Sequence, residues 1–250
     1  MLSTLETLPN KKNKIIYGSM RINEHKYSDQ HWLELFYLMA SKGINLHHVS
    51  YEYDSFNRYC DLLSQFRFKH PKIEINHIVK LSEPDFDGRH FNTKEMHRKI
   101  QLYKDMLQIN KIHTIQWMWR GSLDIEKERL ELLSKQKRNI KDYVLRLKKS
   151  GVIKNFFVFP YTRGFAKSCL KLSFSDGLIV YRNPSETSYD DLIKECSNLN
   201  KKCIVIRPFN AGKEFLSDLS ADELISFSLN LKPIVGTIIS FSNSNQLNFS

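Results

Sequence analysis

Short apolar segments alternate with longer amphipathic segments along most of the chain. The short segments are rich in isoleucine, valine and phenylalanine, which is typical of buried strands. They cover residues 15–19, 44–49, 72–80, 113–119, 152–159, 177–182, 203–208 and 233–240. The longer segments repeat their apolar residues every three or four positions, as one face of a helix does. They cover residues 28–43, 55–68, 93–109, 124–150, 162–173, 188–200 and 221–231.

Eight strands separated by seven helices predict an α/β protein with a (β/α)8 barrel in a single domain. We expect an N-terminal tail at residues 1–14 and the barrel at residues 15–250, and the length of 250 residues suits this fold. The rival is an open doubly wound sheet, but no GxGxxG motif follows the first strand.

The C-terminal end is predicted to be shortened. After the eighth strand only residues 241–250 remain, so the helix that would close the barrel is missing or reduced to a turn or two. The N-terminal tail, another subunit or nothing covers that surface. A homodimer is a hypothesis on this ground, and sedimentation of a strict monomer would remove it.

Composition narrows the class of protein further. No apolar run approaches the roughly 20 residues that span a bilayer, and no signal peptide is evident, so we expect a cytoplasmic protein without a membrane partner. The four cysteines show neither CxxC pairs nor metal-ligand spacing, which predicts reduced thiols and no metal site. The net charge of +11 is spread along the chain, so nucleic acid is not the expected partner.

Functional side chains of such barrels lie at the carboxyl ends of the strands. Those ends are polar, aromatic and basic in this sequence, whereas barrel-filling positions alone would be Val, Ile, Leu and Ala. We therefore expect a small-molecule substrate at this rim. A ligand with several phosphates would also suit a basic mouth.

Several segments together resemble the aldo/keto reductases in order and spacing. They are IIYGSMRI, GINLHHVSYEY, a third strand ending in Lys80, KIHTIQWMWR, IVYRNP, IRPFNAGK and GTIISFSNSNQL, and the likeness runs from about residue 15 to the end. The resemblance implies an NAD(P)H-dependent oxidoreductase that reduces a carbonyl of an aldehyde, ketone or sugar by hydride transfer. In this family a tyrosine donates the proton, an aspartate holds a lysine beside it, and a histidine orients the carbonyl.

Matching by segment places only part of this catalytic set. The tyrosine falls on Tyr53 and the lysine on Lys80, while the aspartate position falls on His48. The histidine position falls on Met118, or on Trp119 with a one-residue slip. The resemblance thus implies a catalytic set of Tyr53, Lys80 and His48.

This departure has a physical consequence for the lysine. Lys80 is expected to lack a carboxylate partner, with Glu52 as a further acid in the same loop as the tyrosine. A neutral imidazole could accept a hydrogen bond from the amine, whereas a protonated one would repel it.

The resemblance also implies binding residues for NADP or NAD and for the substrate. The cofactor set lies after the first, sixth, seventh and eighth strands: Met20, Arg21, Asn183, Arg207, Asn210, Gly212, Lys213, Ser240, Ser242, Asn243 and Gln246. The substrate set follows the fourth and fifth strands: Trp117, Trp119, Arg120 and Tyr161. The Ser-Asn pair that often follows the fifth strand is Phe159-Pro160 here.

Each of these residues also has a simpler interpretation. The tryptophans could be packing residues on alternate faces of a strand, Lys80 a solvated lysine, and Tyr53 an ordinary loop aromatic. The whole chain could likewise be a catalytically silent barrel that binds a small molecule or a protein partner. A non-redox lyase or isomerase acting on a sugar is a third possibility, because one barrel hosts many chemistries.

Overall fold

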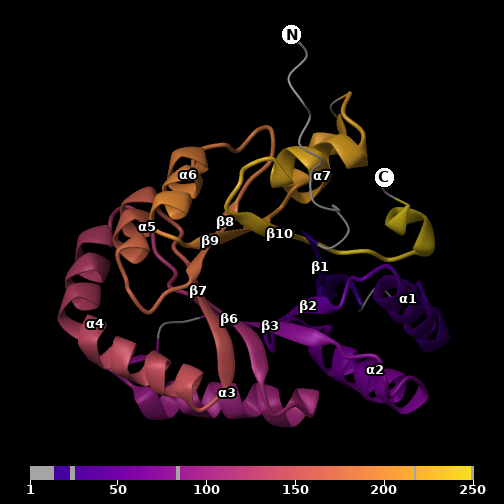
Figure 1. The fold of residues 1–250 in the computed structure, drawn as a ribbon, viewed down its shortest axis with the longest axis horizontal. Coiled ribbons are helices and arrows are strands. Elements are labelled where there is room, and N and C mark those ends of the chain that lie inside the picture. Colours follow the sequence, from indigo (N-terminus) through magenta and orange to yellow (C-terminus); the bar gives the residue numbers. More distant parts are fainter. Residues whose placement is uncertain (1–13, 23–25, 83–84, 217, 249–250) are drawn as a thin grey trace.

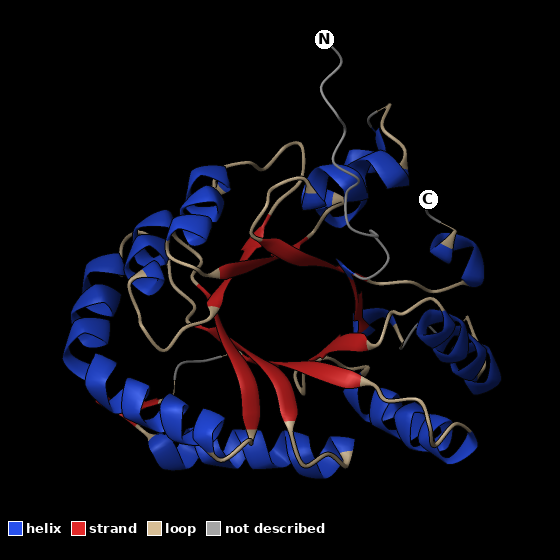
Figure 2. Cartoon of the chain, viewed as in Figure 1, coloured by secondary structure: helices blue, strands red, loops and turns tan. Residues whose placement is uncertain are grey.

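The computed structural model describes residues 14–22, 26–82, 85–216 and 218–248. Eight parallel strands close into a barrel with the order β1-β10-β9-β8-β7-β6-β3-β2 (Figures 1 and 2). Their bounds are β1 Ile15–Gly18, β2 Leu46–Val49, β3 Asn76–Leu81, β6 Ile112–Met118, β7 Ile153–Phe159, β8 Gly177–Tyr181, β9 Lys202–Ile206 and β10 Ile234–Ile239. The predicted (β/α)8 fold is confirmed.

The helices surround this barrel, and seven α-helices are found in the described ranges (Figure 2). They are α1 Asp29–Ser41, α2 Phe56–Lys69, α3 Thr93–Leu107, α4 Glu126–Lys149, α5 Arg163–Leu170, α6 Asp190–Asn198 and α7 Ala221–Leu229. Ser28 caps α1 by accepting a hydrogen bond from the His31 amide, and Gly43 follows that helix with a positive φ of 80°. Local capping chemistry therefore sets these boundaries, as the sequence predicted.

Alternation along the strands divides the apolar side chains between two cores. The inner core comes from the strands and fills the barrel with Ile16, Ile78, Met118, Phe157, Phe159, Ile179 and Ile204. The larger core lies between the strands and the helices and contains Trp32, Phe66 and Phe165. The barrel interior is thus packed with side chains, and ligands are restricted to its ends.

A short helical turn follows β10. The 3-10 helix η4, Ser244–Leu247, packs against α1 beside the end of β10 (Figure 1). One His31 ring nitrogen lies 2.7 Å from the Ser242 carbonyl, and the rings of Phe241 and Tyr17 stack at 6.4 Å. Part of the surface between α7 and α1 is therefore covered by the chain itself.

One element was missed in the sequence. A two-stranded hairpin, β4 Phe86–Asp87 and β5 His90–Phe91, lies between β3 and α3 and packs on α4. The four cysteines are free and buried, as expected for reduced structural thiols. Within the ranges described, no helix has the length and apolar character needed to cross a lipid bilayer.

A buried ion pair gives a test of this packing. Arg182 is 2% exposed, donates to both Asp190 oxygens at 2.8 and 3.1 Å, and also donates to the Phe227 carbonyl. We expect Arg182→Met to lower the free energy of unfolding by about 3 kcal/mol, because the partner groups lose their donor. The exposed pair Arg163–Asp191 is the matched control, and Arg163→Met should cost under about 1 kcal/mol in urea denaturation. Equal losses in the two variants would contradict this assignment.

Candidate active site

Tyr53, Lys80 and His48 come together at the carboxyl rim of the barrel. His48 lies on β2, Lys80 lies on β3, and Tyr53 lies in the turn between β2 and α2. The Lys80 amine is 5.3 Å from the centroid of the Tyr53 ring, and the rings of His48 and Tyr53 are 6.2 Å apart. The rim therefore unites three side chains that the sequence separates.

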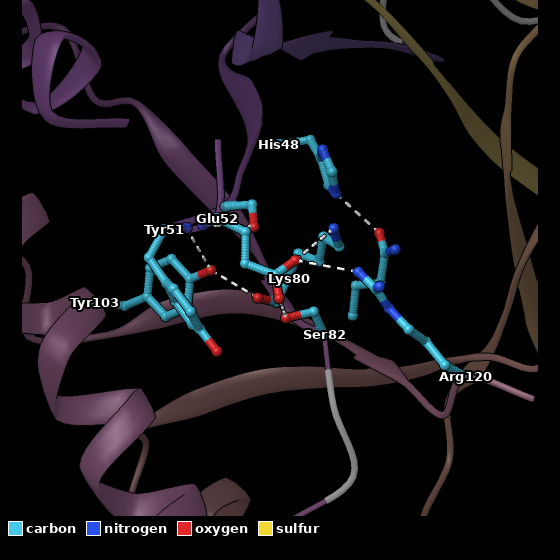
Figure 3. A network of polar contacts seen from close by, with 9 residues as sticks. His48, Tyr51, Glu52, Lys80, Ser82, Tyr103 and Arg120 are labelled. Atoms are coloured by element: carbon cyan, nitrogen blue, oxygen red, sulfur yellow. Dashed lines mark hydrogen bonds and ion pairs between the residues drawn. The ribbon is translucent and has the colours of Figure 1, made fainter. Parts of the chain in front are cut away.

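Glu52 supplies the carboxylate that Lys80 was expected to lack, so that expectation is wrong. Glu52 Oε2 lies 2.9 Å from Lys80 Nζ, and Ser82 donates to the other carboxylate oxygen (Figure 3). Burial opposes ionisation of Glu52, but the hydrogen bonds from Ser82 and Lys80 and the charges of Lys80 and Arg120 lower its pKa. Glu52 is thus an anion at neutral pH.

A buried tyrosine helps to fix the positions of Glu52 and Lys80. Tyr103, on α3, donates to the Lys80 carbonyl at 2.6 Å and accepts from the Tyr51 amide at 3.1 Å (Figure 3). One hydroxyl thereby ties the turn that carries Glu52 to the end of β3. Tyr103 therefore holds the backbone next to both members of the Glu52–Lys80 ion pair.

The tyrosine itself is not activated in this arrangement. The Lys80 amine contacts the face of the Tyr53 ring, and no hydrogen bond from it to the Tyr53 hydroxyl is found in the described part of the chain. Burial and the charge of Glu52 raise the pKa of Tyr53 above its usual value. The predicted tuning of Tyr53 by Lys80 is therefore not realised in this structure.

His48 has an uncharged partner. One of its ring nitrogens, Nε2, lies 2.9 Å from Gln116 Oε1, which fits an imidazole N–H that donates to an amide oxygen. Burial lowers the pKa of His48 to about 4, with the hydrogen bond to Gln116 opposing and the charge of Lys80 adding to the shift. His48 is neutral at physiological pH and does not repel Lys80.

Strand β6, the fourth strand of the barrel, points Met118 into the barrel, whereas the neighbouring tryptophans point toward the helices. Met118 belongs to the inner core, whereas Trp117 and Trp119 belong to the outer core. Trp117 packs on Phe156, and Trp119 packs on Phe165 and Phe86. The prediction of Trp117 and Trp119 as substrate-binding residues is therefore wrong, because strand alternation turns both away from the mouth.

The opposite side of the mouth is aromatic and basic. Tyr161 follows β7 with a positive φ of 64°, and its ring meets Phe159 at 4.7 Å. Phe159 in turn meets Tyr181 at 5.2 Å, and the Arg207 guanidinium lies over the Tyr181 ring at 4.4 Å. The partly exposed rings of Tyr161 and Tyr181 therefore form an aromatic surface bordered by a cation.

The cofactor set after β8 and β10 is largely engaged within the protein. Asn183 is fully buried, donates to the Arg207 carbonyl and accepts from the Ser185 amide, so it supports the loops and does not face a ligand. Ser242 and Asn243 donate their amides to Gln246 Oε1, while Asn243 Oδ1 accepts from the Gln246 amide. The amides of Ser242, Asn243 and Gln246 are therefore engaged within the protein and are not free for a phosphate as they stand.

The remaining predicted positions lie open at the rim. Met20 and Arg21 are exposed after β1, and Lys213 and Gly212 are exposed in η3, Asn210–Leu216, after β9. Asn210 begins η3 with a positive φ of 44°, and it is partly buried. These residues and Arg207 lie beside the mouth of the barrel, where they could contact a bound ligand.

The side chain of Ser240 leaves room only for a glycine at position 18, at the end of β1. A side chain at Gly18 would bring its Cβ to 2.9 Å from the Ser240 hydroxyl oxygen, so the ends of β1 and β10 approach closely here. Ser240 therefore packs against the first strand and is half-buried.

Sequence reasoning missed Gln116, Ser82 and Tyr181 as members of the rim. Gln116 could have been found by alternation, since it shares a face with Met118 and pairs in register with Lys80. Tyr181 lies two residues after Ile179 on β8, so it shares the face of the strand that points into the inner core. Ser82 follows the third strand directly, but its contact with Glu52 depends on the fold of the turn.

Comparison with known proteins identifies solved structures with a similar fold. No family model and no curated protein matches this chain. An aldo-keto reductase from Pseudomonas aeruginosa aligns with a TM-score of 0.73 at 16% identity, covering 94% of this chain and 86% of that one. One from Klebsiella pneumoniae, in complex with NADP and acetate, aligns with a TM-score of 0.65 at 13% identity, covering 92% and 81%. The chain has the fold of the aldo-keto reductases, and the predicted resemblance is confirmed at that level.

Proposed function

We propose that the protein is an NAD(P)H-dependent oxidoreductase that reduces the carbonyl group of an aldehyde, ketone or sugar, with Tyr53 as the proton donor. The convergence of Tyr53, Lys80, Glu52 and His48 at one rim carries this proposal. These are the phenol, amine, carboxylate and imidazole of the family's catalytic set. Two of them, the carboxylate and the imidazole, come from different chain positions than the family uses.

Cofactor binding draws on the open side of the rim. Arg207, Lys213 and Arg21 are exposed cations after β9 and β1, and they suit the phosphates of NADP or NAD. Ser242, Asn243 and Gln246 would contribute only if the Gln246 side chain turned away from the amides that it now accepts from. The Klebsiella pneumoniae relative, which holds NADP on the same fold, supports this assignment.

When bound, the cofactor would supply a hydride to the carbonyl carbon. Tyr53 would donate its hydroxyl proton to the carbonyl oxygen, which leaves negative charge on the phenolate. Lys80, already in contact with the Tyr53 ring, would stabilise that charge by moving from the ring face toward the hydroxyl. Glu52 pairs with the amine and limits where it can move.

His48 would act as a neutral group in this site. Its hydrogen bond with Gln116 fixes the ring orientation, and its low pKa keeps it uncharged beside Lys80. A neutral imidazole next to Tyr53 adds polarity without competing for the carboxylate of Glu52.

Cofactor titration tests the proposal. We expect NADPH or NADH to raise the melting temperature and to quench tryptophan fluorescence in a saturable way. Arg207→Met should weaken this binding about tenfold through loss of a charged contact, whereas Arg98→Met, an exposed arginine on α3, should not. No response to either nucleotide at millimolar concentration would remove the proposal.

A second candidate, a catalytically silent barrel that binds a small molecule, has its own supporting observation. Met118 occupies the position of the family's catalytic histidine and points into the barrel, where it can neither donate nor orient through an N–H. Cofactor binding without turnover on aldehydes, ketones and sugars would favour this candidate. Restoration of activity by Met118→His would connect the two.

A further inference from the structure

Arg120 reaches into the mouth from the end of β6, on the side of Lys80 and Glu52 (Figure 3). Its side chain is 55% exposed, and its contact with Glu52 is long, at 3.5 Å from Nη2 to Oε2. Across the residues that the structure describes, no other hydrogen-bond or ion-pair partner of this guanidinium is found. Most of its five N–H donors are therefore available to a ligand.

Glu52 does not neutralise Arg120. Lys80 and Ser82 bind the same carboxylate more closely than Arg120 does, and Lys80 is only 12% exposed. Two cations thus share one carboxylate, which leaves one positive charge in excess on this side of the mouth. An exposed ion pair at 3.5 Å is also weak and easily exchanged for a better anion.

Flat apolar rings lie beside this cation. Phe159 contacts both Tyr161 and Tyr181 in edge-to-face geometry. Burial raises the pKa of Tyr161, while the charges of Arg120 and Arg207 act to lower it, so both guanidinium groups lie close enough to influence its hydroxyl. A ligand in the mouth would meet an aromatic surface and a cation together.

We propose that the mouth selects carbonyl compounds that carry a carboxylate or phosphate group, and that Arg120 binds this group. The planar guanidinium fork matches both anions with two parallel hydrogen bonds, which a neutral substituent cannot reproduce. The body of the substrate lies on the partly exposed rings of Tyr161 and Tyr181, and its carbonyl points toward Tyr53. The choice of a carbonyl compound rests on the proposed function, whereas the anion site rests on Arg120 itself.

Matched pairs of compounds test the inference. The first pair is 4-formylbenzoate and its neutral near-isostere 4-formylbenzamide, and the second is glyceraldehyde 3-phosphate and glyceraldehyde. Binding to the full chain is measured by isothermal titration calorimetry, and NADPH oxidation is followed separately with the same four compounds. Arg120→Met is compared with wild type, and Arg98→Met, a surface arginine that also has one carboxylate neighbour, is the control.

We expect the anionic member of at least one pair to bind about tenfold more tightly or better, and Arg120→Met but not Arg98→Met to remove that difference. Preference in the first pair identifies a carboxylate, and preference in the second a phosphate. Equal affinities within both pairs, no binding of any compound at millimolar concentration, or a preference that survives Arg120→Met would overturn the inference. Anion-dependent binding without NADPH oxidation would keep the Arg120 site and remove the reductase. Equally fast reduction of neutral and anionic members would keep the reductase and remove the site.

Discussion

Tyr53→Phe is expected to lower kcat/KM for carbonyl reduction by about 10²- to 10⁴-fold, the usual contribution of a positioned proton donor. The substitution removes one oxygen and retains the ring that contacts Lys80 and His48. Cofactor affinity should therefore change little, and the loss should appear in the chemical step. Steady-state kinetics with NADPH and a neutral aromatic aldehyde, together with a cofactor titration, separate these effects.

Tyr51→Phe is the matched control for this experiment. Tyr51 lies two residues away, and its ring packs on Tyr103, outside the proposed catalytic set. Its substitution should leave kcat/KM within about threefold of wild type, because among the described contacts its hydroxyl bonds to none of the proposed catalytic residues. Retention of full activity in Tyr53→Phe would show that another group donates the proton.

Mild acid is expected to destabilise the fold strongly. His47, His48 and His77 are buried, and burial lowers the pKa of His47 to about 3 and that of His48 to about 4. Burial also lowers the pKa of His77 well below its ordinary value. The unfolded chain binds protons below pH 6.5 and the folded chain does not, so stability is complete above pH 6.5 and falls as the pH drops. His47 and His48 should each cost about 2 kcal/mol between pH 6.5 and about pH 5, and His77 should add to the loss in the same direction.

The contacts described around His47 and His77 do little to stabilise an added proton. The Tyr59 hydroxyl lies 2.9 Å from both His47 Nδ1 and His77 Nε2, and one hydroxyl can donate to only one of them. Among the described residues, the other His47 nitrogen, Nε2, is buried and makes no hydrogen bond of standard geometry. A proton added here would have no carboxylate to balance it among the contacts described.

Urea denaturation from pH 7.5 to pH 5 measures this dependence. His77→Gln should reduce the slope of unfolding free energy against pH by about one proton. His97→Gln, at an exposed position on α3, should leave the slope unchanged. A free energy of unfolding that stays constant between pH 7 and pH 5 would contradict the account of these histidines.

Most of the fold could be predicted from periodicity because the barrel repeats one unit. Strand and helix segments differ clearly in their apolar spacing, and caps such as Ser28 mark the ends. The β4–β5 hairpin was missed because each of its strands has two residues, too short for any pattern. The hairpin packs through contacts distant in the sequence, such as Phe86 on Trp119 and Phe91 on Tyr143.

The site was predictable only where a side chain's direction follows from its strand. Lys80 and His48 lie on strands, so their convergence follows from barrel topology once the register is known. Glu52 lies in a turn, where neighbouring residues do not alternate by rule, and its contact with Lys80 depends on the Tyr103 anchor. The same alternation would have excluded Trp117 and Trp119 from the mouth, because Met118 between them faces the barrel.

The arrangement of the proposed catalytic residues follows from their positions in the barrel. A carboxylate on the turn can pair with Lys80 as well as one on β2 can, because both lie beside the end of β3. That frees the His48 position for an imidazole, which Gln116 then orients. In this arrangement the Lys80 amine rests on the face of the Tyr53 ring, and the proposed reaction would require it to shift toward the hydroxyl oxygen.

Transfer of isotope tests the central claim most directly, because it detects even slow turnover. NADPH carrying deuterium at both C4 positions is incubated with the protein and a panel of aldehydes, and the alcohols are analysed by mass spectrometry. We expect an alcohol with one deuterium on the former carbonyl carbon, formed by wild type and greatly reduced in Tyr53→Phe. Binding of NADPH without any deuterated alcohol would contradict carbonyl reduction at this rim.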